Sequence, residues 1–421
     1  MKIAMKLYGF RTVFWAMILL LLVSCANDDV NPDNPIVEQR EGTCFDGIRN
    51  GEEVIVDCGG ECPGFCPPSS LGILGGEVKA TDPDEVGPGR ARVDGLRLDP
   101  KVEYRLIGPL LIRDEARLSI PAGTVIKADP NVGAYIAVAQ GGTLLVSGQP
   151  DNPVVITSGA ENPAPGDWGG IIICGEGPIV SGDVGRTDII DIFYGGSDLM
   201  NSSGGINYLR VEYAGAIAET GQNFDAISFY GVGAFTNITN IQTFESLGNG
   251  IRFIGGNADA EQLVATNSSG NSVVVQDDWS GKGDSWYLNG IAASGIKFTS
   301  NLDIGTNVPV VSDTIGNVSI IGPVSEGGLN YARGGGKYNL SNIFNANLSL
   351  AINVSDETAS EQIDMGNLKI DSIEFDGPVA DFVPSNYTGD NTDFYTEGTT
   401  LGAGNKALAP DWTIGWTTGL Q

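Results

Sequence analysis

The chain of 421 residues contains no histidine. Without an imidazole it can build neither a Ser-His-Asp or Cys-His catalytic site nor a zinc site with a His ligand, so any chemistry falls to carboxylates, Lys, Arg, Tyr or Ser. Positive charge is also scarce, with 23 Lys and Arg against 52 Asp and Glu and a net charge of −29. This balance argues against nucleic acid and anionic membrane surfaces as partners, and it suits divalent cations or a solvated extracellular exterior.

Glycine is the residue in excess, with 60 copies and no G-X-Y period. Together with 41% hydrophobic residues, it is typical of a turn-rich all-β protein that still has a core. Short apolar runs, such as 124–126, 143–146 and 171–173, are separated by Gly, Asn, Asp and Pro. They predict short strands, and no segment shows a helical period.

The amino terminus predicts an export signal over residues 1–24. Three basic residues precede an apolar run from Val13 to Val23, which is too short to span a bilayer. The run ends in Leu22-Val23-Ser24-Cys25, which resembles the bacterial lipobox and implies a diacylglycerol anchor on the Cys25 thiol. The next residues, 26–29, resemble the acidic surface-export signal of Bacteroidetes lipoproteins, which implies the outer membrane with the protein facing the cell exterior. An uncut signal anchor is the alternative.

Residues 25–42 are polar and proline-containing, and they predict a disordered tether. Residues 43–68 form a Cys-rich mini-module. Because an exported piece of this size has no core of its own, its four cysteines predict two disulfides with three pairings open, and their spacing disfavours a zinc site. The cysteines are Cys44, Cys58, Cys62 and Cys66.

The same module resembles a short C-x-D-G-x-x-N-G-x-E motif, closed by D-C-G-G, that recurs in secreted proteins of this bacterial group. Hard oxygen ligands lie close together in it, on Asp46, Asn50, Glu53 and Asp57. A Ca²⁺ loop is one interpretation of this spacing, and Ca²⁺ is the only cofactor that the sequence suggests. The other interpretation is that Asp and Asn cap turns here.

Residues 69–421 predict a β-solenoid with C-terminal strands. The segment 121–126 is echoed by 141–146, about 20 residues later, as expected when apolar side chains stack from coil to coil. Asn-rich turns such as 236–240 are consistent with a solenoid, because Asn tolerates the left-handed backbone conformation that tight corners need.

Three segments, 166–175, 209–215 and 411–416, are similar to a family of exported Bacteroidetes right-handed parallel β-helix lipoproteins, with the Trp168-Gly169-Gly170 triplet among the specific pieces. The resemblance implies a pectate-lyase-like fold, and the family has no settled biochemical role. Where its members tend to show G-D-D-G-F at successive coils, this chain has 247–251 and 269–273 with Asn in place of acids. Any cation or catalytic role of those acids is in doubt here.

One stretch combines acids, a lysine and aromatic rings. A polysaccharide lyase or glycosidase of the parallel β-helix type would work through carboxylates and a basic residue, and indole rings would stack on sugars. The catalytic candidates are Asp277, Asp278, Lys282 and Asp284, and the stacking candidates are Trp279 and Trp286. The alternative is that this stretch is a turn whose indoles pack on the flank of the solenoid.

The sequence thus favours a surface-exposed, non-enzymatic binding or structural lipoprotein, in contact with an extracellular glycan or another envelope protein. The alternative is an enzyme acting on an extracellular polysaccharide. Two D-S/T-aliphatic triplets make Thr314 and Ser372 candidates for O-glycosylation, and Cys174 is expected to be an unpaired, buried thiol.

Overall fold

The computed structural model describes residues 71–79, 95–180, 182–300, 313–334, 337–377 and 387–420. The chain divides into two compact units, Met1–Glu41 and Gly42–Gln421, and all of the described residues belong to the second. The predicted signal, tether and Cys-rich module lie outside the described residues. So do the sites expected there, which are Cys25, Cys44, Cys58, Cys62, Cys66, Asp46, Asn50, Glu53 and Asp57.

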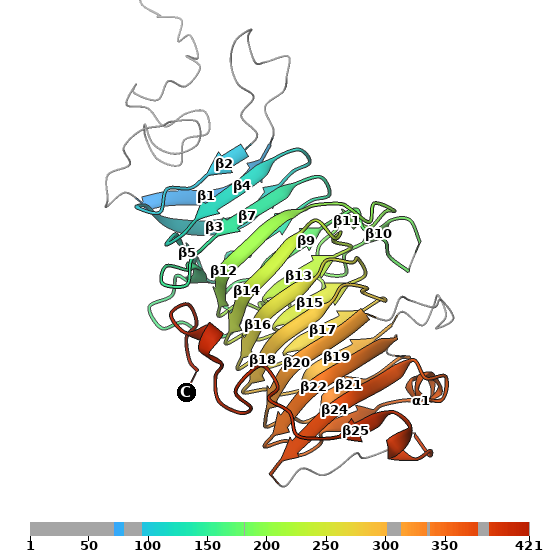
Figure 1. Ribbon diagram of the computed structural model, residues 1–421. Helices are drawn as coiled ribbons and strands as arrows, with labels where there is room; N and C mark the ends of the chain where they lie inside the picture. Colours follow the sequence, from blue (N-terminus) through green and yellow to red (C-terminus); the bar gives the residue numbers. More distant parts are fainter. Residues whose placement is uncertain are drawn as a thin grey trace, which may run out of the picture. The chain divides into compact units, whose positions relative to one another are not determined.

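The described residues form a right-handed parallel β-helix, which confirms the predicted fold class. A 23-stranded sheet joins strands of successive coils (Figure 1), and the register of β12 on β14 and of β16 on β18 is parallel throughout. Each coil has three strand-bearing faces, which we call A, B and C in chain order.

Face A begins with three short strands, which are β2 (Gly95–Arg97), β4 (Arg117–Pro121) and β7 (Thr143–Ser147). Face B begins with the first halves of β1 (Leu71–Val78) and β3 (Glu103–Ile112), followed by β5 (Val125–Ala128) and β8 (Val154–Ser158). From then on one long strand per coil bends across both faces: β12 (Gly204–Glu212), β14 (Asn237–Phe244), β16 (Ala260–Thr266), β18 (Gly283–Asn289), β20 (Asp313–Ile321), β22 (Tyr338–Ala346) and β24 (Leu368–Asp376).

Face C carries the strands that position the candidate site. After the second halves of β1 and β3 it continues through β6 (Tyr135–Val138), β9 (Ile171–Cys174), β13 (Ile227–Tyr230), β15 (Ile251–Ile254), β17 (Val273–Gln276), β19 (Ser294–Thr299), β21 (Gly327–Tyr331) and β23 (Ile352–Val354).

The corner between faces A and B depends on one left-handed residue in each long strand from β12 to β22. Asn240 has the left-handed φ of 54° expected of its Asn-rich segment, although residues 237–240 lie in β14 and not in a separate turn, and its side chain donates to Gln262 of the next coil. A side chain with a short polar head tolerates this conformation and bonds to its copy above, so the corners stack in register. The corner residues are Tyr208, Asn240, Gln262, Ser285, Asn317 and Asn342.

The coil interior is filled by aromatic and aliphatic columns. Phe229 stacks on Phe253 with 5.2 Å between ring centroids, and Phe253 stacks on Trp279 at 4.8 Å. Farther along, Phe298 stacks on Tyr331 at 4.9 Å. Buried side chains thus repeat from coil to coil, and burial of their apolar surface stabilises the stack.

The predicted 20-residue echo does not set the register of the first coils. Arg117 pairs with Thr143 and Val125 pairs with Val155, so those coils are longer than 20 residues. The segment 121–126 turns from face A to face B, whereas 143–147 lies wholly on face A. Similar residues therefore lie on different faces, because both faces alternate inward apolar and outward polar side chains.

Two features depart from strands. The helix α1 (Glu357–Asp364) follows β23, and the carboxylate of Asp356 caps it by accepting the N–H of Ala359. Its 8 residues are too few for a helical period to stand out in the sequence. A face C insertion, residues 175–203, follows β9 and carries the antiparallel pair β10 (Gly185–Arg186) and β11 (Phe193–Tyr194).

The chain end runs back over the coils it has just completed. The 3₁₀-helix η2 (Asn391–Asp393) and β25 (Tyr395–Glu397) come first. Residues 398–420 after them contain no strand and one short 3₁₀-helix, η3 (Asp411–Thr413). This C-terminal strap lies along the outside of face B (Figure 1, dark red). Its backbone accepts from Tyr287 through Ala407, and the Gln242 side chain bonds to Thr418 both ways.

Candidate functional site

The predicted catalytic residues do not gather into one site. Asp277 and Asp278 follow β17 at the end of face C, both with left-handed backbone at φ of 50° and 57°. Asp284 lies on β18 at the start of face A, where it accepts from the side chain of Asn317. Lys282 is exposed in the turn between them. The described contacts join none of the three carboxylates to the Lys282 ammonium.

The prediction that Trp279 and Trp286 stack on a ligand is wrong. Their side chains are 1% and 0% exposed, and both pack against Phe253 inside the coils. Each indole N–H donates to a backbone carbonyl, that of Ala258 for Trp279 and that of Ala260 for Trp286. A buried indole with a satisfied N–H is a core residue, so the two rings cannot meet a sugar.

Asp278 has the most clearly perturbed carboxyl of the predicted set. Burial, together with the neighbouring charge of Asp277, raises the pKa of Asp278 to about 6. Burial also raises the pKa of Asp277, although the charge of Arg252 opposes the rise. A raised carboxyl pKa suits a general acid or base. Glycosidic catalysis by two carboxylates, however, needs a second carboxyl group on the other side of the bond to be cleaved. Here the charge that perturbs Asp278 is that of its sequence neighbour.

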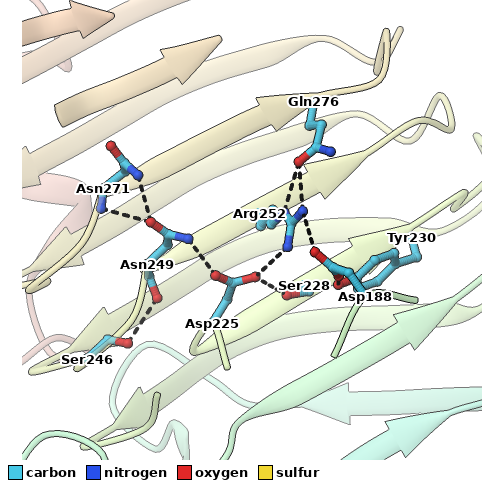
Figure 2. Close-up of polar contacts among 9 residues, drawn as sticks. All are labelled: Asp188, Asp225, Ser228, Tyr230, Ser246, Asn249, Arg252, Asn271 and Gln276. Carbon is cyan, nitrogen blue, oxygen red and sulfur yellow. Dashed lines mark hydrogen bonds and ion pairs between the residues drawn. The ribbon is translucent and has the colours of Figure 1, made fainter. Parts of the chain in front are cut away.

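A polar network crosses face C from the exposed Asp188 to the buried Asp225, and Figure 2 shows its members. Arg252 on β15 donates to Gln276 on β17 and to Asp188 in the face C insertion, with 3.0 Å between Nη2 and Asp188 Oδ2. Asp188 also accepts from the hydroxyl of Tyr230 at 2.5 Å. Burial acts to raise the pKa of Asp188, but the charge of Arg252 together with the hydrogen bonds from Tyr230 and Arg252 outweighs burial, so the pKa is lowered.

Asp225 is the buried carboxylate of this network, 5% exposed and 3.7 Å from the Arg252 guanidinium. Burial raises its pKa, and Arg252, Ser228 and Asn249 only partly oppose the rise. Its Oδ1 accepts from Asn249 at 2.7 Å, and Asn249 Oδ1 in turn accepts from the backbone and side chain of Asn271.

The hydrogen-bonded column of Asp225, Asn249 and Asn271 occupies the positions where members of the resembled family tend to show acidic pairs. Ile227 pairs with Ile251 and Ile251 with Val273, so Asp225, Asn249 and Asn271 stand in one column. One carboxylate and two amides therefore follow one another, and amide N–H groups donate to the carboxylate and amide oxygens of this column. The network's geometry is that of a structural clamp between the insertion and the coils.

A groove of about 1020 Å³ opens beside this network, at the start of face C. Its floor is Tyr135 against Phe224, with ring centroids 5.4 Å apart and planes at 30°. One wall is residues 187–191 of the face C insertion and the other is residues 216–220. The Asp188 contacts with Tyr230 and Arg252 fasten the first wall to the coils.

The groove is acidic and holds no Lys or Arg among the residues that line it in the described chain. Its carboxylates are those of Asp167, Asp188, Asp191 and Glu219. Burial raises the pKa of the Tyr135 phenol, and the charge of Glu219 raises it further. The sequence analysis missed this site, because its floor joins residues 89 positions apart through the fold.

Three other predicted positions are placed as follows. Cys174 is a free, buried thiol, as predicted, and burial raises its pKa. Ser372 lies on β24 and is partly exposed. Thr314 lies on β20, and its side chain lies outside the described residues. O-glycosylation of Thr314 and Ser372 stays a prediction.

Comparison with known protein families matches residues 91–417 to the pectate-lyase-like β-helix domain. The match covers more than half of the chain, so the protein belongs to this family. No curated protein and no solved structure was found to match it. The family fixes the fold, and the function has to be argued from the site.

Neither a metal cluster nor a membrane-spanning helix occurs in the described part of the chain. No three residues of the types His, Cys, Asp and Glu gather there in a group able to hold a metal ion. Among the described helices, none has the length and apolar character needed to cross a bilayer.

Proposed function

We propose that the protein is a lipid-anchored lipoprotein on the outer face of an outer membrane, where it binds an extracellular glycan without cleaving it. The groove on face C carries this proposal. A half-buried Tyr135 packed on Phe224 presents an aromatic surface between two walls, and carboxylates beside it accept hydrogen bonds from hydroxyl groups. Aromatic faces with a few polar groups around them are the usual lining of a ligand site.

Two further features support a binding role over a catalytic one. The predicted catalytic residues lie on different faces of the coils, and the carboxylates closest to Arg252 are tied into the clamp. The lipobox at Cys25 and the acidic residues after it support the anchor and the surface address. The sequence also allows another envelope protein as the partner. We favour a glycan because Tyr135 and Phe224 give the groove an aromatic floor.

Glycan binding is tested with the full chain carrying Cys25→Ser, which removes the acylated thiol and leaves the protein soluble. The protein is incubated with an array of polysaccharides, and Tyr135→Ala is compared with it. We expect retained glycans on the parent protein and a loss on the order of tenfold in affinity for Tyr135→Ala, since an aromatic contact contributes about 0.5–1.5 kcal/mol. Phe235→Ala, which alters a 63% exposed ring outside the groove lining, is the matched control and should bind normally.

A second candidate function is a polysaccharide lyase or glycosidase, favoured by the pKa of about 6 at Asp278. It predicts unsaturated or shortened products from acidic or neutral polysaccharides in the presence of Ca²⁺, and loss of those products in Asp278→Ala. Such turnover would replace the binding proposal, whereas binding with intact polysaccharide would remove the enzymatic one.

Surface placement has its own test. Protease added to whole cells should digest the protein while a periplasmic marker stays intact, and Cys25→Ser should release it from the membrane fraction. A protein that resists protease in whole cells but is digested in lysed cells would contradict the surface placement.

A further inference from the structure

The groove on face C continues into a second hollow. This neighbour has a volume of about 630 Å³ and shares Pro109 and Tyr135 with the first. It is lined by residues of β1 and β3, among them Ile73, Ile107 and Leu111. Ile107 is 48% exposed, so an apolar side chain faces solvent there. The two hollows meet at the Tyr135 ring.

The joined hollows run along the stacking direction of the coils. Pro109 pairs with Tyr135, and the strands β1, β3, β6, β9 and β13 follow one another on face C. Residues at or just before the face C strands of these five coils line the hollows, from Gly76 at one end through Tyr135 to Phe224, and Leu247 of the following coil also lines the groove there. At about 4.8 Å per coil, the groove spans about 19 Å.

Within the described residues, the cations that contact carboxylates of the groove are paired there. Arg252 pairs with Asp188, Arg186 pairs with Asp191, and both Arg113 and Lys79 pair with Glu77 of the second hollow. The lining residues of both hollows include no Lys or Arg. The described lining of the groove therefore offers no unpaired positive charge to a carboxylate or a sulfate on a ligand.

Hydrogen-bond acceptors, in contrast, are free. Glu219 makes no hydrogen bond or ion pair within the described residues, and it is exposed beside Tyr135. Asp167 uses Oδ2 to accept from Ser158 and from the backbone of Ala164, which leaves Oδ1 open. Hydroxyl groups can donate to these oxygens, whereas an anionic ligand would be repelled by them.

From this geometry we infer that the groove selects an uncharged linear glycan and holds about one sugar ring over each of its five coils. The inference rests on the proposed glycan binding and names the class of glycan. A pyranose repeats along a linear chain at roughly the spacing of stacked strands. Tyr135 meets a ring near the middle of the chain, and Ile107 meets a ring toward the β1 end.

The test uses the full chain with Cys25→Ser and five ladders of labelled oligosaccharides, two to six sugars long. Three ladders are uncharged, made of glucose, of mannose and of xylose; one is made of galacturonate and one of glucosamine. We expect affinity for at least one uncharged ladder to rise on the order of tenfold from two to five sugars and then to level off. Galacturonate oligomers should not bind.

Two variants separate the subsites. Tyr135→Ala should weaken short and long oligomers alike, whereas Ile107→Ala should weaken five-sugar chains and leave two-sugar chains unchanged. Tighter binding of the galacturonate or glucosamine ladder than of every uncharged one, or an affinity independent of length, overturns the inference while leaving glycan binding in place. If no ladder and no array glycan binds, the proposed function itself fails.

Discussion

Arg252 on β15 reaches out of face C to Asp188 in the insertion, so one ion pair with 3.0 Å between Nη2 and Oδ2 holds a wall of the groove against the coils. The same guanidinium lies 3.7 Å from Asp225, which is buried. Arg252 therefore balances two carboxylates that belong to separate parts of the chain. Its removal should affect both the fold and the groove.

Arg252→Met should lower the free energy of unfolding by about 3–5 kcal/mol, because it leaves the buried Asp225 carboxylate without its counter-charge. The double variant Arg252→Met, Asp225→Asn should recover much of this loss, since Asn249 and Ser228 can rearrange around an amide. Urea unfolding followed by circular dichroism measures both. A single variant that loses less than about 1 kcal/mol would show that the pair is dispensable.

Asp188→Asn tests the groove wall alone. The Asp188 side chain is 40% exposed, so its ion pair contributes on the order of 1 kcal/mol or less to global stability. Glycan affinity should fall in this variant because residues 187–191 are no longer fastened. Hydrogen exchange of the insertion should rise, and unchanged exchange with unchanged affinity would contradict the clamp.

Stability should depend on pH through Asp278. Its pKa is about 6 in the folded protein, above the ordinary value near 4 that it has in the unfolded chain, so folding takes up a proton between these values. The carboxyl therefore destabilises the fold at pH 7, and this cost is relieved as pH falls through about 6. Asp278→Asn should gain about 1–2 kcal/mol at pH 7 and little at pH 4.

The measurement is the urea midpoint of the wild type and of Asp278→Asn between pH 7 and pH 4. The difference between the two should shrink as pH falls. Asp259→Asn, which alters a carboxyl that accepts the N–H of Lys282 on another turn, serves as the control for replacing a carboxyl by an amide. A constant difference for Asp278→Asn would place its pKa at the ordinary value.

Trp279→Ala and Trp286→Ala should each destabilise the protein by about 3–5 kcal/mol, because both rings fill the interior beside Phe253. Trp279→Phe should cost less, since it keeps a stacked ring. Denaturant unfolding measures these losses. Either alanine variant with wild-type stability but weakened glycan binding would restore the ligand-stacking role that the structure rejects.

Trp416→Ala should loosen the C-terminal strap. The ring is 0% exposed, meets Tyr208 edge-on at 5.7 Å between centroids, and donates its N–H to Trp412. Loss of this packing, about 3 kcal/mol, should detach the strap before the coils unfold. Limited proteolysis should then cut within 398–420, while Ile414→Ala, at a side chain 72% exposed, should leave the cleavage pattern unchanged.

The sequence was sufficient for the solenoid because its signal is local. Ile171–Cys174 is an unbroken apolar run between glycines, which predicts a strand. Asn240 is a residue type that tolerates the left-handed conformation, which predicts a corner, so strands and corners can be recognised from a few residues. The register between strands of successive coils was harder to predict from the sequence. Thr143 resembles Thr124 in its surroundings, yet it stacks on Arg117, because faces A and B present the same alternation of side chains.

The candidate site was out of reach for a different reason. Asp188 and Arg252 are 64 residues apart and Tyr135 and Phe224 are 89 apart, so both pairs exist only once the coils have stacked. Conversely, the acids and indoles that are close in sequence at 277–286 do not form one site, because Trp279 fills the coil interior whereas Asp278 is only partly buried. One signal for the groove was present in the sequence: Tyr135 is an aromatic residue at the first position of a strand, where its side chain faces outward.

The strap changes how the stack can form. In a simple solenoid each coil depends only on its two neighbours, so the stack can lose its end coils one at a time. Here Lys406 bonds to Glu374 near one end, and Thr418 bonds to Gln242 several coils away. The strap therefore joins coils that are not neighbours, so that coils far apart in the stack are linked into one cooperative unit.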